Sequence, residues 1–167
     1  ENGTVTAGNS SGLNDGAAAL VLSTAAAAKS NGLKVKAKIL GYSHSGVRPE
    51  VMGIGPIIAV KKLLDKTGLS EKDFDVIESN EAFAAQACAV SKELHLNSEK
   101  VNPNGGAIAL GHPIGATGAI LTIKALHELE RIDGTLGLIT MCIGGGQGIA
   151  LAIENVWMLS IFKKKKS

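Results

Sequence analysis

The segment Asn102–Gly118, which reads NPNGGAIALGHPIGATG, places one histidine between two glycine-rich stretches. Glycines stand at positions 105, 106, 111, 115 and 118, and Pro113 directly follows His112. Glycine adopts backbone angles closed to other residues, and proline restricts the residue before it to extended or turn geometry. The segment therefore predicts a tight turn that holds a titratable imidazole beside small residues, with room for a ligand. A lone histidine is usually satisfied in a core, but this density of glycine favours a functional site.

A second glycine-rich turn, CIGGGQG, spans positions 142–148 at the end of an apolar run. Cys142 could act there as a base or nucleophile if its pKa is lowered, and the following amides could form an oxyanion hole. A buried structural cysteine in a turn fits the same pattern equally well. Asn80 precedes a predicted helix, as either an N-cap or an amide directed at a carbonyl or a water. Cys88 is predicted to pack in the core.

Composition limits the class of protein. Hydrophobic residues make up 45% and charged residues 19%, which is typical of one globular domain, and aromatics are only 3%, so small aliphatic residues must build the core. The net charge of +2 is exceeded by the four lysines of Lys163–Lys166 alone, so the body has no basic bias toward nucleic acid. No apolar run reaches the ~20 residues of a membrane span. Two cysteines in unlike contexts indicate a reducing compartment.

Strand-like and helix-like segments alternate along the chain, which predicts an α/β layered domain. A glycine turn joins the last two expected strands closely enough for a hairpin. The four histidines lack metal-ligand spacing, so we expect no metal site. The expected strands are Ala17–Ser23, Val35–Ser43, Asp75–Glu78, Leu136–Cys142 and Ile149–Glu154, and the expected helices are Thr24–Ser30, one from Pro56 to Gly68, Glu81–Leu94 and Thr117–Arg131.

Three motifs together, Asn80–Ala84 (NEAFA), Asn102–Gly118 and the turn at 142–148, closely resemble the C-terminal half of the thiolase family. Thr6–Ala19 is similar to the segment that closes a thiolase N-terminal half, and Pro49–Pro56 resembles a thiolase loop. The resemblance is closest to acetyl-CoA acetyltransferases. It implies an α/β, thiolase-like layered fold with a mixed five-stranded sheet and helices on both faces.

The resemblance also divides the chain. Residues 1–30 would be a remnant of the thiolase N-terminal half, and residues 31–154 the C-terminal domain. Residues 155–167 form a lysine-rich tail that has no family counterpart, interpreted as an unrelated extension or, less simply, a membrane-surface anchor. We therefore expect the chain to be the C-terminal portion of a longer enzyme. Ile120 stands where the family usually has arginine.

Thiolases interconvert two acetyl-CoA with acetoacetyl-CoA and CoA by a reversible Claisen condensation. By resemblance, His112 activates the nucleophilic cysteine, Cys142 is the acid/base cysteine, and Asn80 positions an oxyanion-hole water. Gly144 supplies the backbone donor of a second oxyanion hole, and Ser11 and Met52 line the CoA pantetheine site. The substrates are CoA thioesters, and no cofactor or metal is implied.

The family's nucleophilic cysteine belongs to the N-terminal half, and Cys88 does not replace it. The resemblance therefore implies an acyltransferase portion that is inactive alone. Two alternatives stay open: a 3-ketoacyl-CoA thiolase of broader chain length, and a non-catalytic CoA-binding or oligomerisation module. Full-length thiolases are homodimers or homotetramers, so a homo-oligomer without nucleic-acid or membrane partners is expected. A cytoplasmic location is favoured, with mitochondrial and peroxisomal locations left open because no targeting region is visible.

Overall fold

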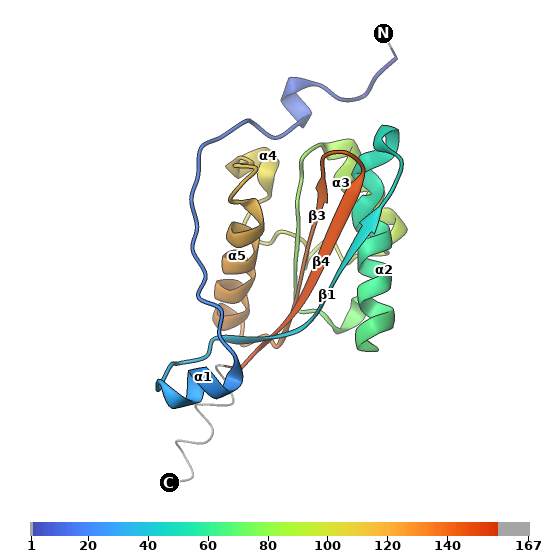
Figure 1. Ribbon diagram of the computed structural model, residues 1–167. Coiled ribbons are helices and arrows are strands. Elements are labelled where there is room, and N and C mark those ends of the chain that lie inside the picture. The colour runs from blue at the N-terminus through green and yellow to red at the C-terminus, as the bar shows by residue number, and fades with distance from the viewer. Residues whose placement is uncertain (1, 157–167) are drawn as a thin grey trace.

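The computed structural model describes residues 2–156, and most of the expected tail at 155–167 lies outside this range (Figure 1). One four-stranded sheet has the order β1-β4-β3-β2. Strand β2 runs parallel to β3, whereas β3–β4 and β4–β1 are antiparallel. The strands are β1 Ala37–Gly46, β2 Val76–Ser79, β3 Leu136–Ile143 and β4 Gln147–Asn155. The predicted α/β class, mixed sheet and β3–β4 hairpin are confirmed.

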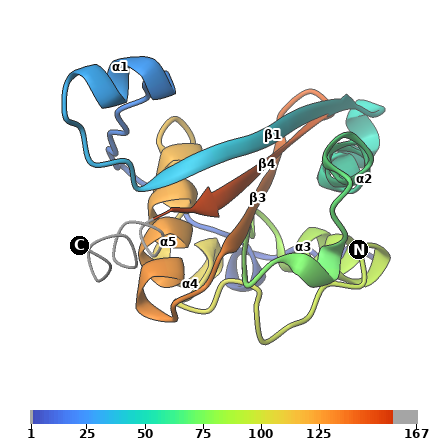
Figure 2. The same cartoon turned by 90° about the horizontal axis from the view of Figure 1, so that it is seen from below.

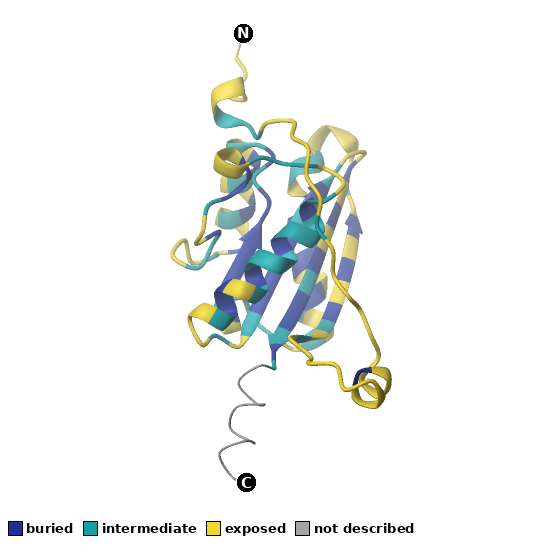
Figure 3. Ribbon diagram, turned by 90° about the vertical axis from the view of Figure 1, so that its left-hand side faces the viewer, coloured by how far each residue is buried: buried dark blue, intermediate teal, exposed yellow. Residues whose placement is uncertain are grey.

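The predicted number of five strands is wrong for the described residues. Beyond β2 the sheet continues only as a single-residue parallel bridge between Ile77 and Val101. The expected strand at Ala17–Ser23 is absent: this segment runs past the outside of the molecule, exposed along nearly its whole course (Figure 3). Val21 is 90% exposed. An apolar run becomes a strand only where a neighbouring strand accepts its hydrogen bonds, and among residues 2–156 no strand lies beside this one.

Helices cover both faces of the sheet, as predicted (Figure 1). The α2 helix packs on one face with α3 beside it, and α5 packs on the other face. The helix α2 ends at Thr67, and the residue that caps it, Gly68, has a φ of +70°, which suits glycine. The α-helices are α1 Ala25–Ser30, α2 Gly55–Thr67, α3 Ala84–Glu93, α4 Ala107–Leu110 and α5 Thr117–Arg131, and the 3-10 helices are η1 Ala7–Asn9, η2 Pro49–Ile54 and η3 Glu71–Asp73. The short α1 stands apart from these layers (Figure 2).

Successive side chains along each strand point to opposite faces of the sheet, which produces one hydrophobic core on each face. Ile77 and Leu138 pack against α2 and α3 together with the fully buried Phe74. Their chain neighbours Val76 and Ile139 pack against α5 on the opposite face. Both cores are built from aliphatic side chains with one phenylalanine, in keeping with the low aromatic content.

The helix α3 differs from the prediction in its first residue and in the exposure of Cys88. The helix begins at Ala84 rather than Glu81, and Cys88 is exposed rather than packed in the core. Gln86 and Val90, four residues apart, form the buried face of α3. Cys88 lies halfway between them, about 200° around the helix from each, and therefore faces solvent. Across the described range, no helix combines the length and apolar character that crossing a membrane requires.

Candidate active site

Asn80 and His112 lie together at one end of the sheet. Asn80 directly follows β2, is 1% exposed, and donates its backbone N–H to the carbonyl of Thr140 on β3 at 3.0 Å. Its side-chain Nδ2 lies 3.3 Å from Nε2 of His112. The N-cap of α3 is Phe83, so the alternative that Asn80 caps this helix is wrong. The Asn80 amide is directed at the imidazole instead.

Thr117 fixes which nitrogen of His112 carries the proton. The Thr117 hydroxyl donates to the carbonyl of Pro113 at 2.9 Å and lies 2.7 Å from Nδ1 of His112. A hydroxyl has only one hydrogen, so its oxygen accepts from an Nδ1–H group. Nε2 is then unprotonated and accepts from the Asn80 amide. Burial lowers the pKa of His112, which also favours a neutral ring able to take up a proton.

The backbone of the histidine turn is held by the N-terminal segment. The N–H of His112 donates to Oδ1 of Asn14 at 3.1 Å, and Leu13 forms a bridge with His112. Gly111 has a φ of +101°, and a Cβ there would lie 2.6 Å from the same Asn14 oxygen, so the position requires glycine. Asn14 could not be selected as a site residue from the sequence, because no local pattern links residues 98 positions apart.

Ser11 contacts the segment that connects β2 to α3, two residues beyond Asn80. Both its N–H, at 3.0 Å, and its hydroxyl, at 3.2 Å, donate to the carbonyl of Ala82. The predicted substrate-binding residue Met52 is half-buried on η2. η2 packs on α3, since a Cβ on Gly53 would lie 2.7 Å from Cγ of Gln86. Neither residue touches His112 through a hydrogen bond within residues 2–156.

Cys142 lies near the end of β3, buried, and the glycine turn begins immediately beyond the strand. Burial raises the pKa of its thiol, so the protonated form dominates in this environment. In the described part of the chain no hydrogen bond joins Cys142 to Asn80 or His112. Gly145 has a φ of +82°, and Gly144 has open space where a side chain would stand. The Gly144 backbone is therefore accessible to a ligand.

A cavity of about 30 Å³ is lined by Asn80 together with Gly111, Thr117 and Lys124. This is room for about one water molecule. Oδ1 of Asn80 is buried and makes no hydrogen bond to any described residue. The same described residues contain no cluster of three or more histidine, cysteine or acidic side chains that could hold a metal ion.

The Thr117→Val variant tests the assigned tautomer. It keeps the buried volume but removes the acceptor of the His112 Nδ1–H, so the free energy of unfolding should fall by about 1–3 kcal/mol. ¹⁵N NMR of the ring should show an increased share of the Nε2–H form. Thr122→Val is the matched control, because Thr122 donates to the carbonyl four residues earlier in the same helix and, within residues 2–156, forms no hydrogen bond with a histidine. Equal ring spectra in the two variants would contradict the assignment.

A neutral imidazole whose Nε2 lone pair faces the Asn80 amide, a buried thiol and an open glycine turn lie at one end of an α/β sheet. These groups define a class of site that moves protons and stabilises negative charge at a carbonyl, as acyl-transfer enzymes do. Residues 33–155 match the model of the thiolase C-terminal domain, and residues 1–26 match that of the thiolase N-terminal domain. The chain belongs to the thiolase family.

Individual relatives agree with the family. The beta-ketothiolase BktB of Cupriavidus necator is 62% identical over 93% of this chain and 40% of its own length. A beta-ketoadipyl-CoA thiolase of Pseudomonas knackmussii is 61% identical over 92% of this chain and 39% of its own length. The crystal structure of the Bacillus anthracis acetyl-CoA acetyltransferase superposes with a TM-score of 0.90 at 54% identity, over 93% of this chain and 39% of that one. The chain thus spans about two fifths of the length of these relatives.

Proposed function

We propose that the chain provides the C-terminal part of an acetyl-CoA C-acetyltransferase site, which converts two acetyl-CoA to acetoacetyl-CoA and CoA. The observation that carries the proposal is the Asn80–His112 contact, with the unprotonated Nε2 of His112 at the site. A thiolase also needs a nucleophilic cysteine. This sequence has only Cys88, exposed on α3, and Cys142. The nucleophile is therefore expected from a thiolase N-terminal domain.

In the first half-reaction, Nε2 of His112 takes the proton of that nucleophilic thiol. The thiolate attacks the carbonyl carbon of acetyl-CoA and the thioester C–S bond breaks. The departing CoA sulfur takes the proton from His112 and leaves as free CoA. The buried Asn80 Oδ1 and the one-water cavity beside it support a water as the oxyanion donor. A lost donor of this type typically costs about 3–4 kcal/mol of transition-state stabilisation.

In the second half-reaction, the Cys142 thiolate takes a proton from the methyl group of a second acetyl-CoA. The resulting enolate attacks the acyl-enzyme carbonyl carbon, the acyl–S bond breaks, and acetoacetyl-CoA forms. The released cysteine thiolate then recovers a proton from the Cys142 thiol. Accessible backbone at Gly144 supports an oxyanion donor for this step. Burial raises the pKa of Cys142, so a neighbouring positive charge or donor in the complete site must lower it again.

Ser11 and Met52 are proposed to line the pantetheine channel, each beside α3 or the chain leading into it. The alternative is a thiolase that accepts longer acyl chains, and the names of the beta-ketothiolase and beta-ketoadipyl-CoA thiolase relatives favour this alternative. A measured acyl-chain preference distinguishes it from the main proposal. A homo-oligomeric assembly and a cytoplasmic location stay predictions.

Reconstitution tests the proposal. The chain is co-expressed with the N-terminal domain of the beta-ketothiolase BktB, and thiolysis of acetoacetyl-CoA is measured by loss of its absorbance. We expect turnover from the combined polypeptides and none from either one alone. A combined complex that forms but cleaves neither acetoacetyl-CoA nor longer 3-ketoacyl-CoA thioesters would support the non-catalytic alternative. Preference for the longer thioesters would favour the broader thiolase.

Cys142→Ala should reduce the turnover of this complex by about 10²–10⁴-fold, because the variant removes the proposed acid/base group. Its matched control is Cys88→Ala, which removes the exposed thiol on α3. The control should retain full activity. The assignment fails if Cys142→Ala keeps more than a tenth of the wild-type rate, or if Cys88→Ala loses as much.

A further inference from the structure

Asn102 pairs with β2 through its backbone N–H and, at the end of the strand, through its side chain. The parallel pairing at Val101 consists of two hydrogen bonds, from Ile77 N–H to Lys100 O at 2.9 Å and from Asn102 N–H to Ile77 O at 2.8 Å. The backbone then leaves β2, and the side-chain amide of Asn102 makes the next two hydrogen bonds to this strand. Its Oδ1 accepts from the N–H of Ser79 at 2.9 Å, and its Nδ2 donates to the carbonyl of Ser79 at 2.8 Å.

The backbone of Asn102 adopts a conformation that few side chains tolerate. Its φ is +47°, in the left-handed region. Such a conformation costs on the order of 1 kcal/mol for a residue other than glycine, although asparagine is one of the better-suited types. The residue is also buried. Both observations indicate that the side-chain contacts to Ser79, the residue just before Asn80, determine the conformation.

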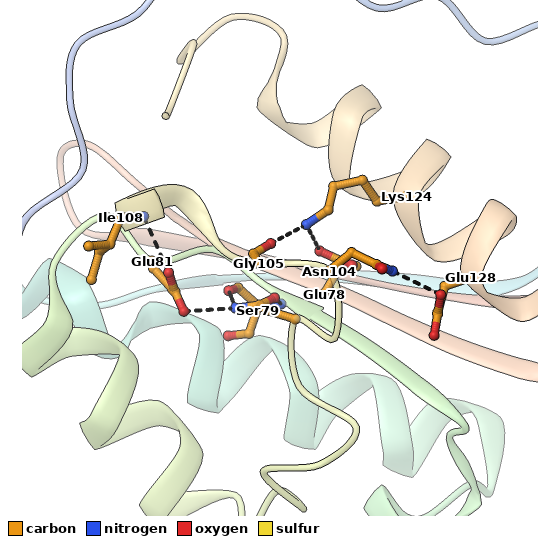
Figure 4. A network of polar contacts seen from close by, with 9 residues as sticks. Glu78, Ser79, Glu81, Asn104, Gly105, Ile108, Lys124 and Glu128 are labelled. Carbon is orange, nitrogen blue, oxygen red and sulfur yellow. Dashed lines mark hydrogen bonds and ion pairs between the residues drawn. The ribbon is translucent and has the colours of Figure 1, made fainter. Parts of the chain in front are cut away.

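Glu81, the residue that follows Asn80 in the chain, extends this connection to Ile108 (Figure 4). Its Oε1 accepts from Nδ2 of Asn102 at 3.2 Å, and its Oε2 accepts from the N–H of Ile108 on α4 at 3.2 Å. The carboxylate lies directly against Gly106, where any Cβ would collide with it. The helix α4 ends at Leu110, two residues before His112.

We propose that Asn102 and Glu81 are positioning residues, which join the strand end bearing Asn80 to the loop bearing His112 and so set the contact between these two side chains. The two residues hold both chain neighbours of Asn80 and the helix leading to His112, without touching the imidazole. Their importance for catalysis rests on the proposed function. Their expected effect on the pKa of the His112 ring does not depend on the proposed function.

The test is the titration of His112 in the full 167-residue chain, followed by ¹⁵N NMR of labelled histidine. Glu81→Gln keeps the volume but can accept at one oxygen only, and Asn102→Ala removes all three amide contacts. We expect either change to loosen the packing around the ring and so to raise its pKa toward the ordinary value of 6.5. In the reconstituted complex, kcat should fall by about 10–100-fold with KM little changed.

Asn104→Ala is the matched control, because Asn104 lies in the same loop but donates to Glu128 on α5, away from Asn80. It should leave the His112 titration and kcat unchanged. The proposal is overturned if folded Glu81→Gln and Asn102→Ala chains titrate as wild type, or if Asn104→Ala shifts the ring equally. Should Asn102→Ala fail to fold, Glu81→Gln alone decides. An inactive wild-type complex would contradict the proposed function and leave the titration result standing.

Discussion

His112→Ala is expected to lower kcat/KM for acetoacetyl-CoA thiolysis by about 10⁴-fold in the reconstituted complex. General acid–base catalysis typically contributes 10²–10⁴-fold, and an oxyanion donor typically contributes 10²–10³-fold. His112 is proposed to take up the thiol proton, and the Nε2–H group formed in this way is proposed to donate to the thioester oxygen as well. The contributions of groups acting as a unit do not multiply fully. The measurement is steady-state kinetics, with circular dichroism to confirm that the variant folds.

His127→Ala is the control for this variant. His127 lies on α5, and its side chain is 74% exposed. Its removal should change kcat/KM less than twofold. The proposed role of His112 would be contradicted if His112→Ala folded, assembled with the N-terminal domain, and retained more than about one hundredth of the wild-type kcat/KM.

Structure determined by neighbouring residues could be predicted from the sequence. The predicted helix Thr117–Arg131 matches α5 at both ends, because its apolar spacing is helical and a glycine turn precedes it. The hairpin of β3 and β4 follows from two apolar runs around three glycines. His112 could be selected as a site residue for the same reason, since its glycines and proline are all local.

Structure determined by distant residues could not be predicted in this way. The extended segment at Ala17–Ser23 has the composition of a strand, but pairing depends on a neighbour that the sequence pattern does not reveal. Asn14 meets the backbone of His112 from 98 positions away. The side-chain pairing of Asn102 with Ser79 depends likewise on where the chain leaves the sheet. Such contacts between remote segments set the geometry of the candidate site.

The pair of Glu78 and Lys124 provides the largest expected effect on stability. Glu78 on β2 is fully buried, and its Oε2 lies 2.7 Å from Nζ of Lys124 on α5 (Figure 4). Lys124 also donates to the carbonyl of Gly105 at 2.6 Å. Lys124→Met would leave a buried carboxylate without its counter-charge, so the free energy of unfolding at pH 7 should fall by about 3–5 kcal/mol.

Urea unfolding measures this loss. Lys61→Met is the control, since Lys61 pairs with Glu93 at 3.0 Å where both side chains are more than half exposed. That change should alter the free energy of unfolding by less than about 1 kcal/mol. The double variant Glu78→Leu/Lys124→Met should recover most of the lost stability, because it removes the buried charge as well as its partner. A Lys124→Met chain as stable as Lys61→Met would show that the buried pair contributes little.

The loss of unfolding free energy in Lys124→Met relative to wild type, called the deficit below, depends on pH in a way that identifies its cause. Burial already raises the pKa of Glu78 above 4.5 in the wild type, and Lys124 opposes that rise. Without Lys124 the pKa rises further, so the folded variant holds a proton that the unfolded chain releases near pH 4.5. Its stability is therefore lost as the pH increases from about 4.5 to the folded-state pKa, and regained on acidification. The deficit relative to wild type should be smaller at pH 5 than at pH 7. A deficit equal at both pH values would instead assign the loss to the hydrogen bond with Gly105 and to packing of the lysine stem, neither of which titrates in this range.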